Sequence, residues 1–159
     1  MNAINHFLLS FNLLLIIFGY KIPIWELALF SVIFAVLIDL HQIIGWIERK
    51  PRHHKRTWLE EPPALFIIAL PIAILLSLLR SQNFLLVMIP YGVHILLDYL
   101  TIHEVSPLAP FSKKKYNTGI FHRLPKKEWF SPKDSTFSEG YVLTVNIIII
   151  ASILAIYLT

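Results

Sequence analysis

Five long runs of apolar residues, separated by polar or proline-containing segments, dominate the pattern of this chain. They cover residues 4–18, 24–47, 63–79, 84–102 and 141–158. The apolar residues are concentrated in these blocks rather than spread along the amphipathic pattern that a surface helix of a soluble protein shows. Most are close to the ~20 residues that a helix needs to cross a bilayer. The pattern therefore predicts an all-α fold, a polytopic membrane helical bundle with five transmembrane helices.

The composition agrees with this prediction. Hydrophobic residues make up 56% of the 159 residues and charged residues 15%, and the mean hydropathy is +0.64. Soluble domains contain about 25% charged residues. The length allows a single integral membrane domain. Residues 4–18 are interpreted as a helix rather than a cleaved signal peptide, because no Lys or Arg precedes the run and no small-x-small cleavage site follows it.

The positive charges indicate how the chain crosses the membrane. Twelve of the 14 Lys and Arg residues lie in two loops, 48–62 and 103–139, and the other two are Lys21 and Arg80. Five spans put both loops on the side of the N-terminus, so the positive-inside rule predicts that this side is cytoplasmic, at the cell membrane. The net charge of +4 is attributed to topology and to membrane lipids, and no nucleic-acid partner is expected.

The loop 103–139 combines prolines, aromatic residues and lysines, a mixture that suits a segment at the lipid head groups. Within it, Pro107–Ser112 is predicted to form a rigid turn. Lys113–Lys115 is predicted to contact lipid rather than to take part in catalysis.

The fourth run contains two ionisable residues in an apolar setting. His94 and Asp98 are four residues apart, so they lie on one face of the predicted helix, one turn apart. Such a pair is unfavourable in a membrane unless it is hydrated, paired or bound to a metal. From the spacing alone, a pair of metal ligands and a structural pair that hydrogen-bonds a neighbouring helix are equally good interpretations.

The predicted topology indicates which other polar residues lie close to His94 and Asp98. The second and fourth helices both run toward the cytoplasm, which places their polar residues roughly 6 to 12 Å below that boundary. The residues expected near one depth are Asp39, His41, His53, His54, His94 and Asp98. The chain has no cysteine, and imidazole and carboxylate ligands suit zinc, manganese or iron. A metal there would make hydroxide available for attack by lowering the pKa of bound water.

Other polar residues receive structural interpretations. His6, His103 and His122 show no partner in the sequence pattern and are expected to be structural. Glu60 and Glu61 precede the third helix and suit its N-terminus electrostatically, although one of them is also able to reach a metal.

The fourth run and its exit resemble a known family. His94, Asp98 and Thr101, followed by Pro110-Phe111-Ser112 and then Lys113–Lys115, match the pattern of the membrane-bound metal-dependent hydrolases, small inner-membrane proteins of YdjM type. That family also has an Asp-x-Asp-His element and a later His-Arg-x-x-Thr-His element. The corresponding stretches here are Asp39-Leu40-His41-Gln42 and His53-His54-Lys55-Arg56-Thr57-Trp58. The resemblance covers about half of the chain.

Both of these further elements depart from the family pattern. His41 stands in place of an acid, Gln42 in place of a His, His54 in place of the Arg, and Trp58 in place of the final His. Arg56, two residues after His54, is positioned to supply the guanidinium that the family's Arg would provide. These departures bear on whether the chain keeps a complete metal shell.

The resemblance and the common depth together predict a metal-dependent hydrolase that cleaves a phosphoester or ester of a lipid at the cytoplasmic interface. The predicted ligands of a divalent metal, zinc, are Asp39, His53, His94 and Asp98. The predicted catalytic residues are His54, Arg56 and Thr57. His54 would act as acid or base because its unperturbed pKa is near neutrality, and the other two would steady an anionic group.

The alternative is a membrane protein without catalytic activity. In that case its Asp and His residues form a structural network between helices, and its basic loops bind lipid or a partner protein. The departures at His41, Gln42 and Trp58 favour this second hypothesis.

Overall fold

The fold is helical wherever the structure is described. The computed structural model describes residues 3–39, 57–100, 105–116 and 136–158. Within these ranges the regular structure consists of helices and of one isolated backbone bridge between Val105 and Tyr116. Helices occupy the described part of each of the five apolar runs. The all-α prediction is confirmed.

Several of the helices contain irregular turns. The α-helical segments are α1 Ala3–Phe18, α2 Ile24–Ser31, α4 Pro62–Ala64, α5 Leu70–Ser77, α6 Asn83–Leu100 and α7 Thr136–Leu158. A π-helical turn at Val32–Val36 and a 3-10 turn at Leu37–Asp39 continue α2, and a second π-helical turn at Leu65–Ala69 joins α4 to α5. This second turn comes just before Pro71, which has no N–H to donate back along the helix.

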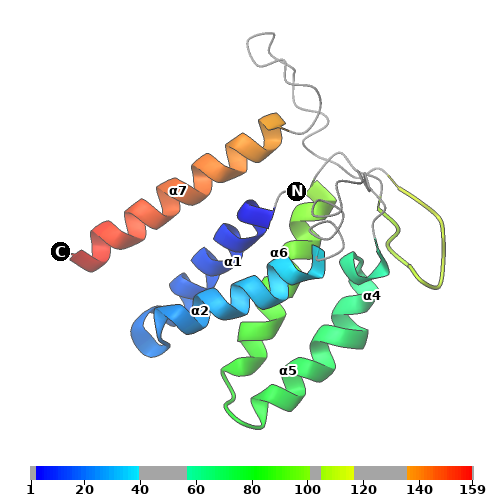
Figure 1. Ribbon diagram of the computed structural model, residues 1–159, viewed down its shortest axis with the longest axis horizontal. Coiled ribbons are helices and arrows are strands. Elements are labelled where there is room, and N and C mark those ends of the chain that lie inside the picture. The colour runs from blue at the N-terminus through cyan, green and yellow to red at the C-terminus, as the bar shows by residue number, and fades with distance from the viewer. Residues whose placement is uncertain (1–2, 40–56, 101–104, 117–135, 159) are drawn as a thin grey trace, which may run out of the picture.

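Helix α6 lies at the centre of the bundle (Figure 1). It packs against α1, α2 and α5, while α7 packs along α1 on the outside. More than half of the residues of α6 are buried, which agrees with this central place. The helix passes through Pro90 without ending, because its packing on three neighbours compensates for the hydrogen bond that proline cannot make.

Small side chains allow α5 and the turn before it to approach α6 closely. Ala64, Ala69 and Ala73 are completely buried and belong to one cluster with Val87 and Tyr91 of α6. Alanine lets helix backbones come near each other, and the van der Waals contact that results drives helix association in membranes. This contact fixes the third apolar run against the face of α6.

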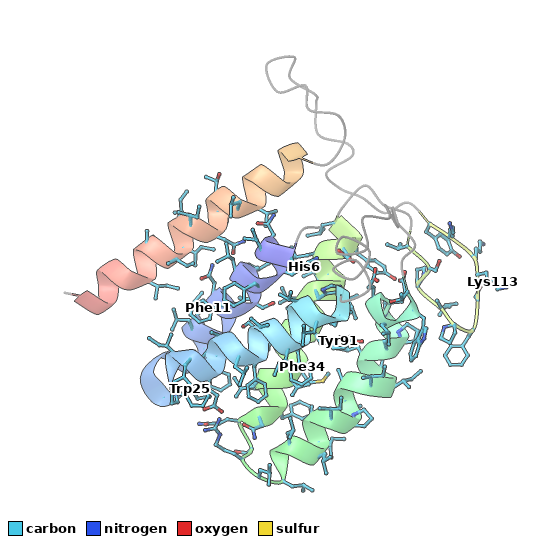
Figure 2. The ribbon with its side chains drawn as sticks, in the orientation of Figure 1. His6, Phe11, Trp25, Phe34, Tyr91 and Lys113 are labelled. Atoms are coloured by element: carbon cyan, nitrogen blue, oxygen red, sulfur yellow. The ribbon has the colours of Figure 1, made fainter. Side chains whose placement is uncertain are left out.

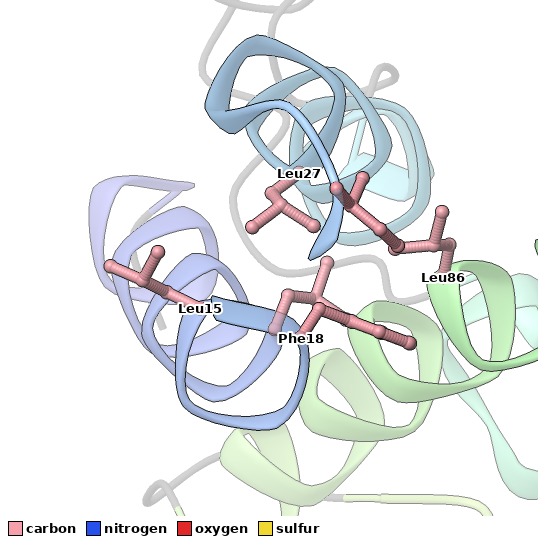
Figure 3. Close-up of a cluster of buried hydrophobic side chains, with 6 residues drawn as sticks. Leu15, Phe18, Leu27 and Leu86 are labelled. Carbon is pink, nitrogen blue, oxygen red and sulfur yellow. The ribbon is translucent and has the colours of Figure 1, made fainter. Parts of the chain in front are cut away.

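A second cluster joins the other side of α6 to α1 and α2 (Figure 3). Leu15 and Phe18 of α1 meet Leu27 of α2 and Leu86 of α6. Ile22, in the short connection between α1 and α2, is also buried there. The cluster holds α1 in register with α6, so it determines which residues of the two helices face each other further along.

The turn between α5 and α6 is held by polar contacts at the opposite end of α6 from Asp98. Arg80 forms an ion pair with Glu26 of α2 and also donates hydrogen bonds to the side-chain oxygen of Asn83. Asn83 in turn donates to the carbonyl of Leu76, at 3.1 Å. These contacts connect α2, α5 and the start of α6.

The helix Asn83–Leu100 is long and apolar enough to cross a membrane, by its length and composition. Its 18 residues span about 27 Å, close to the ~30 Å thickness of the hydrocarbon core. Four shorter apolar helices accompany it, namely Ala3–Phe18, Ile24–Val36, Pro62–Ser77 and Val142–Ile153. A single helix of this length and composition is weak support for a membrane protein. The five spans and the cytoplasmic N-terminus therefore stay predictions.

Candidate metal centre

His94 and Asp98 face each other on α6, as their spacing predicted. The Nε2 atom of His94 lies 3.7 Å from Oδ2 of Asp98. Both residues are buried, with His94 fully inaccessible and Asp98 4% exposed. Two ionisable groups thus share a small interior space near the C-terminal end of α6.

His6 of α1 completes a group of three. Its Nε2 atom lies 3.2 Å from Oδ1 of Asp98, and its ring stacks on that of His94 with 4.2 Å between the ring centroids. Like His94, His6 is completely buried, and it lies where α1 runs beside α6 (Figure 2). We refer to His6, His94 and Asp98 as the triad. Its members come from two helices, and His6 lies 88 positions before His94 and 92 before Asp98 in the chain.

A backbone carbonyl fixes the orientation of the His94 ring. The Nδ1 atom of His94 lies 2.7 Å from the carbonyl oxygen of Ala35. Because a carbonyl oxygen only accepts, Nδ1 carries the proton and donates it. In the neutral ring, Nε2 then keeps its lone pair and points it toward Asp98. Histidines that bind metals are held in this way by a second hydrogen bond from the other ring nitrogen.

The Ala35 carbonyl belongs to the π-helical turn Val32–Val36 of α2. Such turns widen a helix locally and are common at functional sites. Ala35 itself is completely buried, and its small side chain allows the backbone of α2 to approach the ring of His94. The π-helical turn that continues α2 therefore contributes to the site through its backbone.

The triad has the donor set and the dimensions of a metal site. One ligand atom from each of its three residues lies within 4.8 Å of the other two. Around a tetrahedral zinc ion with bonds near 2.0 Å, ligand atoms are roughly 3.3 Å apart. The His6 Nε2 to Asp98 Oδ1 separation of 3.2 Å and the His94 Nε2 to Asp98 Oδ2 separation of 3.7 Å are close to this value. Two histidines and one carboxylate are the protein ligands of several catalytic zinc sites and of mononuclear iron(II) sites.

The charges of the triad also suit a cation. A buried carboxylate is unfavourable unless an opposite charge or several hydrogen bonds compensate for it. Asp98 has the His6 ring at 3.2 Å for this purpose. A divalent cation between the three residues would satisfy the carboxylate and both imidazole lone pairs. Among the residues that the structure describes, this is the group of three His, Asp or Glu side chains that comes close enough to hold a metal ion.

The other predicted site residues are only partly within the described chain. His53, His54 and Arg56 lie outside the described residues, in the stretch 40–56, and Asp39 is described only as the last residue of a 3-10 turn. Their predicted roles stay predictions. His41 and Gln42, at which the chain departs from the family pattern, lie in the same stretch. His103 and His122 also lie outside the described residues, in the stretches 101–104 and 117–135.

Thr57 takes part in a helix cap in the described structure. Its backbone N–H and its hydroxyl both donate to Oε1 of Glu60, each at 3.2 Å. The backbone N–H of Glu60 in turn donates to the side chain of Thr57, which completes a capping box at the 3-10 turn Trp58–Glu60 before α4. The observed contacts are therefore local, and the predicted contact of Thr57 with an anionic group stays a prediction.

Glu60 and Glu61 are both buried beside the start of α4. Glu61 accepts a hydrogen bond from the hydroxyl of Tyr99 at 2.8 Å and another from the backbone N–H of Ser106 at 2.9 Å. Neither glutamate belongs to the group that could hold a metal ion. Glu61 instead joins the end of α6 to the segment that follows it.

His6, for which the sequence pattern showed no partner, lies against Asp98 and His94 in the structure. His6 contacts both other members of the triad because α1 and α6 run in opposite directions. The start of α1 therefore lies beside the end of α6. His6 and Asp98 are each within about one turn of these ends. The predicted topology already contained this signal, since it placed the N-terminus on the side where the fourth helix ends.

Comparisons with known proteins do not identify the chain. No protein-family model matches it, and no curated protein or solved structure is significantly similar to it. The resemblance to the membrane-bound metal-dependent hydrolases therefore stays a prediction that rests on the residues quoted above.

Proposed function

We propose that this protein is a membrane-embedded hydrolase that depends on a divalent metal, zinc, held by the triad. The observation that carries the proposal is the convergence of His6, His94 and Asp98 at 3.2 and 3.7 Å. The hydrogen bond from His94 to Ala35 supports it, because this bond leaves Nε2 of His94 as a ligand. The three protein ligands leave further coordination positions for water or substrate, as catalytic zinc sites do.

In this proposal each residue of the chain has a defined task. His94 presents a lone pair from a ring that Ala35 holds in place, and His6 presents a second imidazole from α1. Asp98 supplies the negative charge that lowers the net charge of the centre. A zinc ion, when bound, supplies Lewis acidity and brings the pKa of a coordinated water close to neutrality. Asp39 and His53 are proposed as further ligands.

The proposed substrate is a phosphoester or ester, most simply of a lipid. Large apolar side chains on the outer faces of several helices support a lipid environment. Exposed examples are Ile16, Ile17, Leu29, Ile67, Ile74, Leu75, Leu78, Leu79, Ile147 and Ile148. The proposed localisation is the cell membrane with the N-terminus in the cytoplasm, which places the triad near the cytoplasmic surface. His54 as acid or base, and Arg56 and Thr57 as the residues that hold the anionic group, complete the proposal.

Metal analysis of the purified protein tests the proposal most directly. Protein prepared without chelator should contain about one zinc ion per chain, and His94→Ala should lose it. Asn12→Ala is a matched control, because Asn12 is also a buried polar residue of α1 but bonds α7 through Asn146. It should keep the metal. The proposal fails if the unaltered protein contains no stoichiometric metal and takes up none when zinc is added.

Hydrolysis is tested separately with chromogenic phosphoesters and esters presented in detergent micelles. Activity should require the metal and should disappear in His94→Ala while remaining in Asn12→Ala. If the protein binds zinc stoichiometrically but hydrolyses neither class of substrate, the result supports the metal centre and excludes the hydrolase function.

The second candidate is a structural network without a metal. The observation that favours it is the His6–Asp98 contact of 3.2 Å, which already pairs an imidazole of α1 with a carboxylate of α6. In this case His6→Ala and Asp98→Ala lower thermal stability but change no metal content. The same metal analysis therefore distinguishes the two candidates.

A further inference from the structure

Residues 105–116 form a closed loop on the side of the bundle. The backbones of Val105 and Tyr116 pair at its base, with N–H to oxygen contacts of 2.9 and 2.8 Å between the two residues. Val105 is completely buried. In Figure 1 the loop, in yellow-green, extends sideways beyond α4. We call it the 105–116 loop.

Hydrogen bonds within the loop give it a defined shape. The N–H of Ala109 donates to the carbonyl of Ser106 at 2.8 Å, and the N–H of Ser112 donates to that of Leu108 at 2.9 Å. The Ser112 hydroxyl accepts from the N–H of Lys114 at 3.2 Å. These successive turns hold the tip in one conformation, so its side chains are presented without a large loss of conformational entropy on binding.

Glu61 anchors the loop to the end of the bundle that carries the triad. One carboxylate oxygen accepts from the N–H of Ser106 at 2.9 Å, and the other accepts from the hydroxyl of Tyr99 at 2.8 Å. Tyr99 is the neighbour of Asp98 in α6. The loop is therefore fixed at the level of the helix ends, where lipid head groups would lie if α6 crosses a bilayer.

The surface of the loop combines apolar tip residues with a run of positive charge. Leu108 is 61% exposed and Phe111 78% exposed. Three consecutive exposed residues, Lys113–Lys115, follow them, and Figure 2 shows Lys113 at the outer side of the loop. The ammonium group of Lys114 lies 5.3 Å from the centre of the Tyr116 ring, a cation–π contact that keeps the charge close to an aromatic surface.

We propose that the 105–116 loop binds the head groups of anionic phospholipids. The lysines would contact the lipid phosphates, while Phe111 and Leu108 enter the boundary between head groups and acyl chains. An exposed apolar tip beside clustered lysines is the arrangement that interfacial segments use. Each lysine near an anionic membrane strengthens binding by about five-fold, so three give roughly a hundredfold. The proposal concerns lipid binding and does not depend on the metal centre or on hydrolysis.

The absence of cysteine from the chain makes a site-specific probe simple. Ala109→Cys provides a single thiol at the tip, to which a polarity-sensitive fluorophore is attached, and leaves Leu108 and Phe111 in place. The labelled protein is reconstituted into vesicles of phosphatidylcholine alone, or with about one quarter phosphatidylglycerol. We expect blue-shifted emission and quenching by bromine-labelled acyl chains in the anionic vesicles, and a reversal of both effects as salt is added.

Charge variants of the labelled protein provide the controls. Replacement of Lys113, Lys114 and Lys115 by Gln should abolish the response to anionic lipid, whereas Lys21→Gln should preserve it. Lys21 is also exposed but lies after the end of α1, away from His6. Unchanged gel-filtration profiles show that the variants are folded. The proposal is overturned if the probe responds equally in both kinds of vesicle, or if it stays accessible to aqueous iodide in both.

Discussion

Replacing Asp98 by Asn separates the two possible roles of the triad. The substitution keeps the shape of the side chain and one carbonyl oxygen, so His6 can still donate to it at about the observed 3.2 Å. It removes the negative charge. A structural network loses only the charge-assisted part of one hydrogen bond, whereas a metal centre loses its anionic ligand.

The expected magnitudes differ between the two cases. Hydrogen bonds to charged groups contribute about 1.5–3 kcal/mol and neutral ones about 0.5–1.5 kcal/mol, so Asp98→Asn should lower the metal-free free energy of unfolding by about 1 kcal/mol. Asp98→Ala removes the partner altogether and should cost about 3–5 kcal/mol, as for other broken buried pairs. For a chain of this size, 1 kcal/mol corresponds to roughly 2–4 °C in melting temperature.

Zinc gives the deciding comparison. At a concentration about a hundred times its dissociation constant, a ligand stabilises the folded state by about 2.7 kcal/mol. Thermal unfolding of the detergent-solubilised protein should therefore shift upward by roughly 5–10 °C when zinc is added. The shift should be small or absent in Asp98→Asn. An equal zinc-dependent shift in the variant and the unaltered protein would refute the role of Asp98 as a ligand.

Three further substitutions test the packing around the site by thermal unfolding in detergent. Asn12→Ala removes hydrogen bonds of 3.0 and 3.2 Å to Asn146 and should cost about 1 kcal/mol without changing the zinc-dependent shift; a lost shift would mean that α7 supports the triad. Tyr91→Phe removes the bond to the Leu59 carbonyl at 2.7 Å and should cost about 1 kcal/mol; no change would mean that this bond contributes nothing. Ala73→Leu overfills the α5–α6 contact and should cost about 1–3 kcal/mol; a neutral result would contradict the close packing inferred there.

The irregular turns after α2 and before α5 differ in how far the sequence explains them. Pro71 lacks a backbone N–H, and the π-helical turn Leu65–Ala69 ends two residues before it. The π-helical turn Val32–Val36 had no such signal, because it contains neither proline nor glycine. Its Ala35 carbonyl receives the hydrogen bond from His94, so the contacts of this ring are connected with the local shape of α2.

The sequence by itself determined the helices and half of the candidate site. Long apolar runs specify helices because burying their backbones requires that the hydrogen bonds be made within each segment. The spacing of His94 and Asp98 placed them on one face because side chains four residues apart are neighbours on any α-helix. Both conclusions depend on local geometry, which is the same wherever the helix packs.

Only the tertiary structure decided which groups meet that face. The periodicity of a helix shows which of its residues share a side, but the rotation of one helix against another depends on packing. Here Leu15, Phe18, Leu27 and Leu86 set the register of α1 and α2 against α6. That register brings His6 to Asp98. The contact with Ala35 is even harder to predict from the sequence. Every residue has a backbone carbonyl, so no residue type in the pattern identifies the one that accepts the bond.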